Sequence, residues 1–446
     1  MSVGDSKRVM AQSNWRFAIR ALRSRNYRLF FGGQSISLVG TWMTRIATSW
    51  LVYRLTKSPF LLGLTSFAGQ APTFFLGPFA GVWVDRWDRH RTLIVTQILS
   101  MLQSFGLAVL ALLHVITIWE VILLMLFQGL INSFDMPARQ AFVVQMVDDR
   151  NDLSNAIALN SSMVNAARLV GPAIAGVLIA AVGEGYCFLL DGISYIAVII
   201  SLFSMHVQPR AAGQAHRRVL VDFREGLTYV TRSVPIRSIL LLLSVISIVG
   251  MPYTVLMPVF ASKVLGGGAH TLGFLMSAVG VGALASALSL AARKTVLGLG
   301  RMIAISAALF GATLIAFSFS RVLWLSLVLL LFTGFGFLQQ MAASNTILQT
   351  IVAEEKRGRV MSFYAMSFQG VAPFGSLIAG ACAARIGAPH TLAFGGALCI
   401  VAGLWFAREL PAIRHDVRPI YRELGILPEL AGGIHTASQL QTPPKT

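Results

Sequence analysis

Residues 60–91, FLLGLTSFAGQAPTFFLGPFAGVWVDRWDRHR, run from a long apolar stretch directly into a short basic loop. A helix that crosses the roughly 30 Å hydrocarbon layer of a membrane needs about 20 apolar residues. Backbone groups in that layer are satisfied only in helices or closed barrels. Similar stretches recur along the whole chain, and they are apolar nearly all round, unlike the striped helices of soluble proteins. The sequence therefore predicts an all-α integral membrane protein.

Twelve such stretches are long enough to be transmembrane helices. The expected spans are residues 28–53, 60–82, 92–114, 117–138, 155–182, 185–207, 237–262, 270–292, 300–319, 322–345, 360–386 and 389–408. The composition agrees, because only 12% of the residues are charged and the mean hydropathy is +0.70.

Positive charge marks alternate sides of these spans. The chain has 36 lysines and arginines and a formal net charge of +18. Most of these residues lie in the two tails and in the loops after even-numbered spans, and because positive loops stay cytoplasmic, both termini are expected in the cytoplasm. Contact with anionic lipid then accounts for the charge, and no nucleic-acid partner is expected. A few basic residues lie near the opposite ends, namely Arg54, Lys57, Lys263, Arg321 and Arg385.

The chain divides into two similar halves around one longer interruption. The expected parts are a basic N-terminal segment (1–27), a six-helix bundle (28–208), a cytoplasmic linker (209–236), a second six-helix bundle (237–408) and a loosely ordered cytoplasmic tail (409–446). The linker contains an expected amphipathic helix, Asp222–Val230, that would lie on the membrane surface. Weak sequence similarities between the halves, such as that of Leu62–Ser66 with Leu272–Ser277, indicate a pseudo-repeat of the kind found in secondary transporters.

Motifs of enzymes are missing from the sequence. We find no nucleophile elbow, P-loop, HExxH motif or cluster of histidine and cysteine. The cysteines, Cys187, Cys382 and Cys399, lie in or beside spans and lack metal-ligand spacing. No enzymatic activity, cofactor or metal site is therefore expected, and the missing Walker motif argues against a self-contained ATP-driven pump.

The loop after the second span carries a recognisable pattern. Gly81 would let the span approach a neighbouring helix, and Asp85 would face the positive N-terminal end of a helix in the other half. The arginines that follow, Arg86, Arg89 and Arg91, would anchor the loop at the lipid head groups. This pattern resembles the signature of the major facilitator superfamily, except that Asp88 replaces a glycine, and the resemblance extends over all twelve spans.

Two further stretches narrow this resemblance. Asp135–Ala141 and Arg357–Ser362 resemble the bacterial exporter branch that includes the enterobactin exporter and macrolide-efflux proteins. The resemblance implies a bacterial inner-membrane protein that moves a small amphipathic molecule outward against proton uptake. We expect the protein to be a monomer. Gly171 and Pro172 are similar to part of a motif found in exporting members. The alternative is that they only bend and pack the fifth span.

Polar side chains inside the spans are the candidates for binding the transported molecule or a proton. Gln34, Thr41 and Arg45 share one face of the first span, and Gln128, Asn132, Asp135 and Arg139 share one face of the fourth. The resemblance implies that both faces line a central cavity. It also leads one to expect an arginine before Gln128–Gly129, where Met125 stands instead. Asp191 and Gln340 complete the candidate set.

Alternatives remain open for several of these residues. Arg45 would either bind the transported molecule or extend towards the outer surface, and Asp135 would either carry a proton or form a structural pair with Arg139. We favour Asp135 as the proton site, with Asp191 next, although Asp191 could instead be buried and paired.

The predicted function is secondary active transport, namely proton-coupled efflux of a siderophore, drug or metabolite by alternating access. Uptake, or lipid or lysolipid flipping, by the same fold is the main alternative. A sensor or scaffold that transports nothing is a minor one, because a scaffold has no need to keep Arg45 within the membrane.

The topology can be tested by replacing single residues with cysteine and labelling intact cells with an impermeant reagent. Cysteines at Lys57, Lys263 and Arg321 should react from outside, whereas cysteines at Arg218 and Lys356 should react only after the cells are opened. Labelling at Arg218 in intact cells would contradict the predicted orientation.

Overall fold

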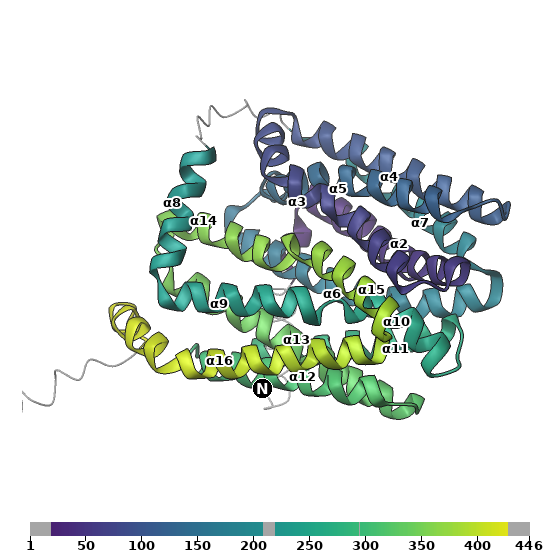
Figure 1. Ribbon diagram of the computed structural model, residues 1–446. Coiled ribbons are helices and arrows are strands. Elements are labelled where there is room, and N and C mark those ends of the chain that lie inside the picture. Colours follow the sequence, from purple (N-terminus) through teal and green to yellow (C-terminus); the bar gives the residue numbers. More distant parts are fainter. Residues whose placement is uncertain (1–18, 208–218, 294, 427–446) are drawn as a thin grey trace, which may run out of the picture.

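A computed structural model describes residues 19–207, 219–293 and 295–426, and the side chains of Pro78, Asp85, Arg150 and residues 219–223 lie outside this description. The described part is helical, with no strand. Its long helices lie side by side in Figure 1, while the shorter α8 (Val219–Arg232) crosses the left end of the bundle. We call the end where α2 begins the terminal end, and the opposite end the distal end.

The first group of helices follows a short 3₁₀ turn, η1 (Arg20–Arg23). It consists of α2 (Arg25–Thr56), α3 (Pro59–Arg86), α4 (Arg89–Leu112), α5 (Ile118–Met146), α6 (Leu153–Val182) and α7 (Glu184–Phe203), with a second 3₁₀ turn, η2 (Arg150–Asp152), before α6. In this group α2 packs on α6 and α7, α4 packs on α5 and α7, and α3 packs on α5.

The second group contains two interrupted rods. The first comprises α9 (Val234–Val245), η3 (Ile246–Gly250), α10 (Tyr253–Val259) and η4 (Phe260–Val264), and the second comprises α14 (Glu354–Ala365), η5 (Met366–Gly370) and α15 (Ala372–Ile386). The remaining helices are α11 (Ala269–Ala291), α12 (Leu299–Phe319), α13 (Leu323–Ile351) and α16 (Ala388–Glu423). The segments η3, η4 and η5 are π-helical turns, which recur at functional sites in other proteins.

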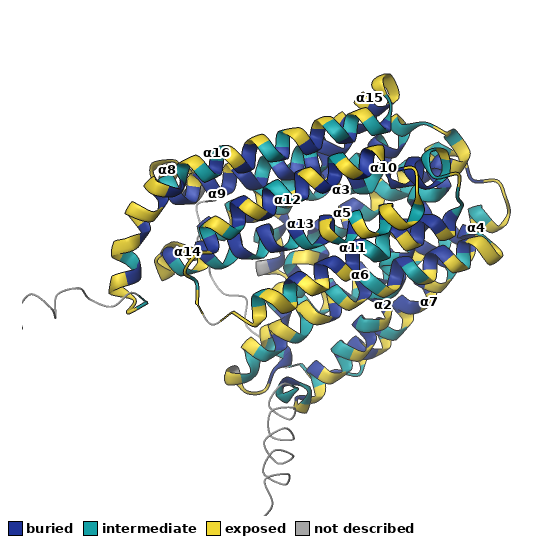
Figure 2. Ribbon diagram, turned by 90° about the horizontal axis from the view of Figure 1, so that it is seen from below, coloured by how far each residue is buried: buried dark blue, intermediate teal, exposed yellow. Residues whose placement is uncertain are grey.

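Ten of the described helices are long and apolar enough to cross a membrane. The other two long helices, α2 and α3, are more polar: α2 carries four arginines, and α3 is diluted by glycine, proline and glutamine. The ten helices together with α2 and α3 correspond to the twelve expected spans. Large apolar side chains remain exposed, including Trp324 at 78% and Phe394 at 65%. Figure 2 shows exposed residues along the outer faces of the helices. Exposed apolar surface on this scale belongs against lipid.

Several helices extend beyond the expected spans at the terminal end. The second, fourth and tenth spans continue to Arg86, Met146 and Ile351, because a helix persists into the head-group region after its apolar pattern has ended. The expected helix at Asp222–Val230 forms as part of α8.

The expected loosely ordered tail differs most from the structure. Helix α16 continues to Glu423, and Leu410, Ile413, Val417 and Tyr421 are buried along one face of it. Their spacing of three and four residues keeps this end on the bundle. Residues 427–446 of the expected tail and residues 1–18 of the expected N-terminal segment lie outside the described part.

The two groups meet through α6 with α11 and through α3 with α15. Glycine makes both contacts close. A Cβ atom added to Gly176 would lie 2.8 Å from the Cα atom of Gly273, and one added to Gly63 would lie 3.1 Å from the Cα atom of Gly380. Both pairs lie in the distal half of the bundle, so the groups touch there backbone to backbone.

Substitution of Gly176 should therefore weaken this interface. We expect Gly176→Ala to lower the unfolding free energy by about 1–3 kcal/mol, because overpacking forces backbone to move. Thermal unfolding of the purified protein in detergent measures the effect.

The matched control is Gly77→Ala, where an added Cβ atom meets nothing within 4 Å. This variant should be as stable as the unmodified chain, or more so, because alanine favours a helix over glycine. Equal melting temperatures for the two variants would show that the contact between α6 and α11 is not close.

Candidate functional site

The charged residues in the middle of the helices of the first group form three clusters. The first ties α5 to α4. Asp135 is 5% exposed and pairs with Arg139 one turn later. Its Oδ1 atom also accepts hydrogen bonds from the Thr96 hydroxyl (2.9 Å) and the Gln97 amide (2.7 Å). This carboxylate therefore has a cation and two neutral donors, a well-compensated buried charge.

The same face of α5 continues with amide side chains. The Gln128 amide donates to the Ser100 hydroxyl and to the Asn132 Oδ1 atom, both at 3.2 Å. The Oε1 atom of Gln128 is buried without a partner among the described residues. The polar face expected on the fourth span is thus one continuous face, and it packs partly on α4.

Asp191 forms the second cluster, between α7, α2 and α4. Its Oδ2 atom accepts hydrogen bonds from Thr44 (2.9 Å) and Ser104 (2.8 Å), while Oδ1 is buried without a partner. No ion pair with Asp191 occurs in the described part of the chain. Gly40 makes room for this carboxyl group, because a Cβ atom there would lie 2.6 Å from Oδ1. Asp191 is therefore a buried carboxyl group held only by hydroxyls.

Tyr195 lies between the two acidic clusters. It follows Asp191 by one turn of α7 and is 6% exposed.

The third cluster consists of two arginines around one indole. The guanidinium carbon of Arg45 lies 4.8 Å from the centre of the Trp42 ring, and that of Arg168 lies 5.3 Å from it. Both distances are typical of cation–π contacts. Arg168 comes from α6 and reaches Trp42 because Gly171 allows α6 close to α2: a Cβ atom at Gly171 would lie 2.5 Å from the Trp42 Cβ atom.

The neutral candidates occupy both groups. Gln34 on α2 and Gln340 on α13 are buried, and each has an Oε1 atom without a partner among the described residues. The amide of Gln340 donates to Ser344 at 3.3 Å, and the hydroxyl of Thr41 donates to the Ser37 carbonyl at 3.0 Å.

The expected gating motif lies where α3 ends and α4 begins. Arg86 and Arg91 are exposed, and Arg89 is half-buried. The backbone of Asp85 continues α3, but its side chain lies outside the described part. The close approach expected at Gly81 is not made, because an added Cβ atom there would meet nothing within 4 Å.

Asp88, which stands where the superfamily signature has a glycine, has a local structural role. Asp88 is the N-cap of α4, and its carboxylate accepts hydrogen bonds from the backbone N–H groups of His90 (2.9 Å) and Arg91 (3.2 Å). Aspartate is among the best N-cap residues, so it starts α4 directly after the loop.

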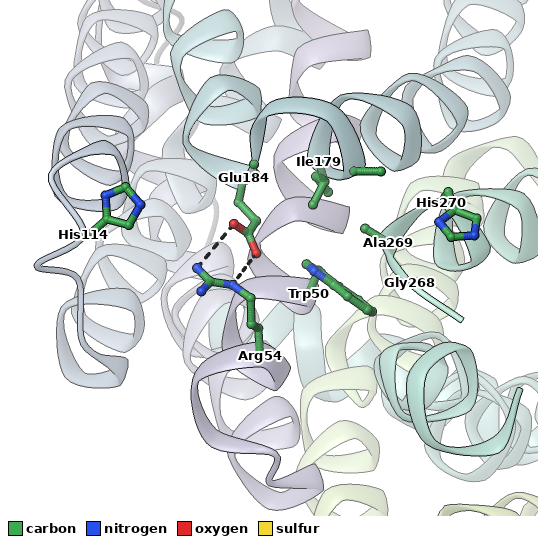
Figure 3. Close-up of a pocket in the computed structure, with 10 residues that line it drawn as sticks. Trp50, Arg54, His114, Ile179, Glu184, Gly268, Ala269 and His270 are labelled. Carbon is green, nitrogen blue, oxygen red and sulfur yellow. Dashed lines mark hydrogen bonds and ion pairs between the residues drawn. The ribbon is translucent and has the colours of Figure 1, made fainter. Parts of the chain in front are cut away.

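A pocket of about 390 Å³ opens at the distal end, with lining residues from α2, α6, α7 and the start of α11. Figure 3 shows Arg54 and Glu184 pointing towards each other at its edge, with Trp50 beside them. Arg54 Nε lies 2.8 Å from the Glu184 carboxylate. This pair joins α2 to α7 inside the first group, so it supports that group and does not close the two groups on each other.

A second pocket, of about 450 Å³, lies at the terminal end between α8 and α14. Arg359 pairs with Glu225 at 2.8 Å, and Lys356 lies 4.5 Å from the Tyr229 ring. These contacts dock the linker helix on the second group.

Sequence reasoning missed Trp42, Thr44 and Ser104. Trp42 precedes Arg45 by three residues, a spacing that places both on adjacent faces of one helix, so the pattern could have been noticed. The hydroxyl partners of Asp191 come from other helices, and the sequence carries no signal for such contacts. Among the described residues, no three His, Cys, Asp or Glu side chains are grouped so as to hold a metal ion.

Known proteins resemble this chain over most of its length. The staphyloferrin A transporter of Staphylococcus aureus is 27% identical over 389 residues, which cover 85% of this chain and 95% of that protein. The multidrug efflux pump Tap of Mycolicibacterium fortuitum is 25% identical over 351 residues, which cover 76% and 85%. A solved POT family transporter in complex with 5-aminolevulinic acid has a TM-score of 0.68 at 12% identity and covers 87% of this chain and 97% of its own.

The fold and the family agree with the resemblance inferred from the sequence. The solved structure shares the fold alone at its low identity, and residues 17–424 match the family described as transmembrane secretion effector. The protein is a multi-pass membrane transporter and not an enzyme. The chain belongs to the transmembrane secretion effector family of the major facilitator superfamily.

Proposed function

We propose that this transporter exports a small amphipathic molecule from the bacterial cytoplasm by alternating access, driven by proton uptake. One observation carries the proposal: the two groups touch through glycine backbones in the distal half, while charged side chains lie buried below that contact. A transporter that alternates between two states needs such a contact. It keeps one side closed, and it can open without pulling interdigitated side chains apart. The relative named as a multidrug efflux pump supports the direction of transport, and the one named as a staphyloferrin A transporter supports a small-molecule cargo.

The orientation follows from the distribution of charge. The terminal end carries Arg86, Arg224, Arg232, Lys356 and Arg359, and positive loops stay on the cytoplasmic side. The terminal end is therefore the cytoplasmic end of our proposal, and the closed glycine contacts face outward. In this arrangement the cargo enters from the cytoplasm.

Transport in proteoliposomes tests this function. With the protein inserted terminal end inward, an inward-directed proton gradient should drive labelled cargo out of the vesicles, and an uncoupler should abolish the effect. Dyes and siderophores are suitable first cargoes. Accumulation with the opposite sign would indicate uptake, and exchange of labelled lipid alone would indicate a flippase. No movement of any of these would contradict transport.

For the proton site, the contacts favour Asp191 over Asp135. Asp135 has Arg139 beside it together with two donors, so its negative charge is matched in the structure. Asp191 has no cation and is held by Thr44 and Ser104. A hydroxyl can either donate or accept, so this site accommodates a carboxyl group with or without its proton. The hydrogen bond from Thr44 connects it to α2, the helix that carries Arg45.

We therefore expect Asp191→Asn to lose accumulation driven by a pH gradient while it keeps exchange of cargo between the two sides. The asparagine is similar in shape and never releases a proton, so the uncoupled cycle should continue. The measurement compares pH-driven accumulation with energy-independent counterflow in the same vesicles.

Asp135→Asn is the matched variant. It leaves Arg139 without its carboxylate, so it should lower the stability of the protein, by about 3–5 kcal/mol for a buried pair, more than it changes coupling. If Asp135→Asn loses coupling and Asp191→Asn retains it, the proton site is Asp135, as the sequence pattern favours.

A further inference from the structure

Two positive charges inside the first group have no negative partner. Among the described residues, neither Arg45 nor Arg168 forms an ion pair or donates a hydrogen bond, and the Nε atom of Arg168 is buried without any partner. By contrast, Arg139 and Arg54 are paired with Asp135 and Glu184. An unpaired charge within a membrane span is costly, and here two like charges also repel each other.

The nearby carboxylates are already engaged. Asp135 is bound to Arg139, and Asp191 is held by Thr44 and Ser104 on the other side of α2. The only described contact of the two guanidinium groups is with the face of Trp42. A ring face attracts cations but does not neutralise them. The positive charge of this site can therefore be balanced by an anionic ligand from outside the chain.

The site is accessible from the interior of the bundle. Arg45 is exposed although it lies on α2 about 17 Å along the axis from Thr56, at 1.5 Å per residue. On the helical wheel it falls with Gln34 and Thr41, on the side away from the exposed Ile36. That side is turned away from Gly33 and Gly40, which pack on α7, so Arg45 is not covered by the helices of its own group.

Both groups contribute to the surroundings of the site. On α11 in the second group, a Cβ atom added to Gly280 would lie 3.0 Å from the Cα atom of Leu169 and 3.4 Å from the carbonyl oxygen of Arg168. Gly176 lies eight residues beyond Arg168 on α6, so the closed distal contact is about 12 Å further along that helix. The contact between α6 and α11 thus extends from Gly176 down to the level of Arg168, and in our proposal alternating access exposes the site to each side in turn.

We propose that Arg45, Trp42 and Arg168 bind an oxyanionic group of the cargo, a carboxylate or a phosphate, so that the transported molecule is an organic anion. This inference rests on the proposed transport function. Guanidinium groups bind such oxyanions through paired, charge-assisted hydrogen bonds, and two of them on one indole hold the anion against a rigid apolar surface. The indole face also offers a place for the apolar part of an amphipathic cargo.

Binding can be tested without knowing the cargo. The purified full-length protein is heated in detergent with citrate, tricarballylate or inorganic phosphate, against sodium chloride and glycerol at matched ionic strength. A ligand that binds only the folded state raises the melting temperature in a concentration-dependent way. We expect at least one oxyanion to do so and saturate, with citrate and phosphate distinguishing a carboxylate site from a phosphate site.

Three variants localise the effect. Arg45→Gln and Arg168→Gln should each weaken oxyanion binding roughly ten- to a hundredfold, since hydrogen bonds to charged groups are lost. Arg28→Gln is the matched control, because it removes one exposed arginine from the same helix α2 and should leave binding unchanged. Without ligand, the first two variants should be at least as stable as the unmodified protein, because each removes an unpaired charge.

Each result has a definite meaning. The inference is overturned if no oxyanion stabilises the protein beyond chloride, if Arg45→Gln and Arg168→Gln bind as well as the unmodified protein, or if both are markedly less stable without ligand. If the protein binds the anion but exports nothing, the binding site is supported and the proposed export function is refuted. If the protein exports a neutral cargo and neither Arg45→Gln nor Arg168→Gln changes that export, the binding site is refuted and the export function is supported.

Discussion

The structure depends on contacts in which glycine removes the side chain between two backbones. Gly176 with Gly273 and Gly63 with Gly380 bring α6 onto α11 and α3 onto α15. Lipid chains are as apolar as leucine, so helices in a membrane gain little from burying apolar side chains and associate through close packing instead. A smooth contact of this kind holds two groups of helices together in one arrangement and lets them part in another. Interlocked large side chains would resist that separation.

Close packing also decides which charges meet inside the first group. Gly171 brings Arg168 onto Trp42, and Gly40 makes room for Asp191 next to Thr44. Arg54 pairs with Glu184 at the distal end. Deeper in this group, within the described part of the chain, Arg45, Arg168 and Asp191 form no ion pair. Because isolated buried charge is costly, a fold keeps it where a ligand or a proton supplies the missing partner.

Much of the fold could be predicted from the sequence, because the surrounding solvent is the hydrocarbon layer of a membrane. A hydrocarbon layer fixes the length of each span, so the apolar pattern located all twelve rods. It could not locate the terminal ends of α3, α5 and α13, where the helices continue into a polar layer that no longer selects apolar residues. It also missed the end of α16, where burial of Ile413, Val417 and Tyr421 on the bundle overrides a polar, proline-containing sequence.

The candidate site was predictable only in part. Spacing along one helix identified the polar faces that carry Arg45 and Asp135, because residues three and four apart lie together. Spacing says nothing about partners on other helices. The hydroxyls of Thr44 and Ser104 reach Asp191 from α2 and α4, and Arg168 reaches Trp42 from α6. Tertiary packing therefore changed the relative standing of Asp135 and Asp191 as proton carriers.

The two groups differ in how their helices are built, and this difference bears on coupling. The spans of the first group are unbroken α-helices, whereas α9–α10 and α14–α15 contain π-helical turns. A π-turn displaces backbone carbonyls from their usual donors, and the Ser247 hydroxyl in η3 donates to the Phe368 carbonyl in η5. The two interruptions are thereby bonded to each other. Phe374 follows η5 by four residues, and the centre of its ring lies 5.2 Å from that of Phe74 in α3. A change in either turn would therefore reach the contact between α3 and α15, which joins the two groups of helices.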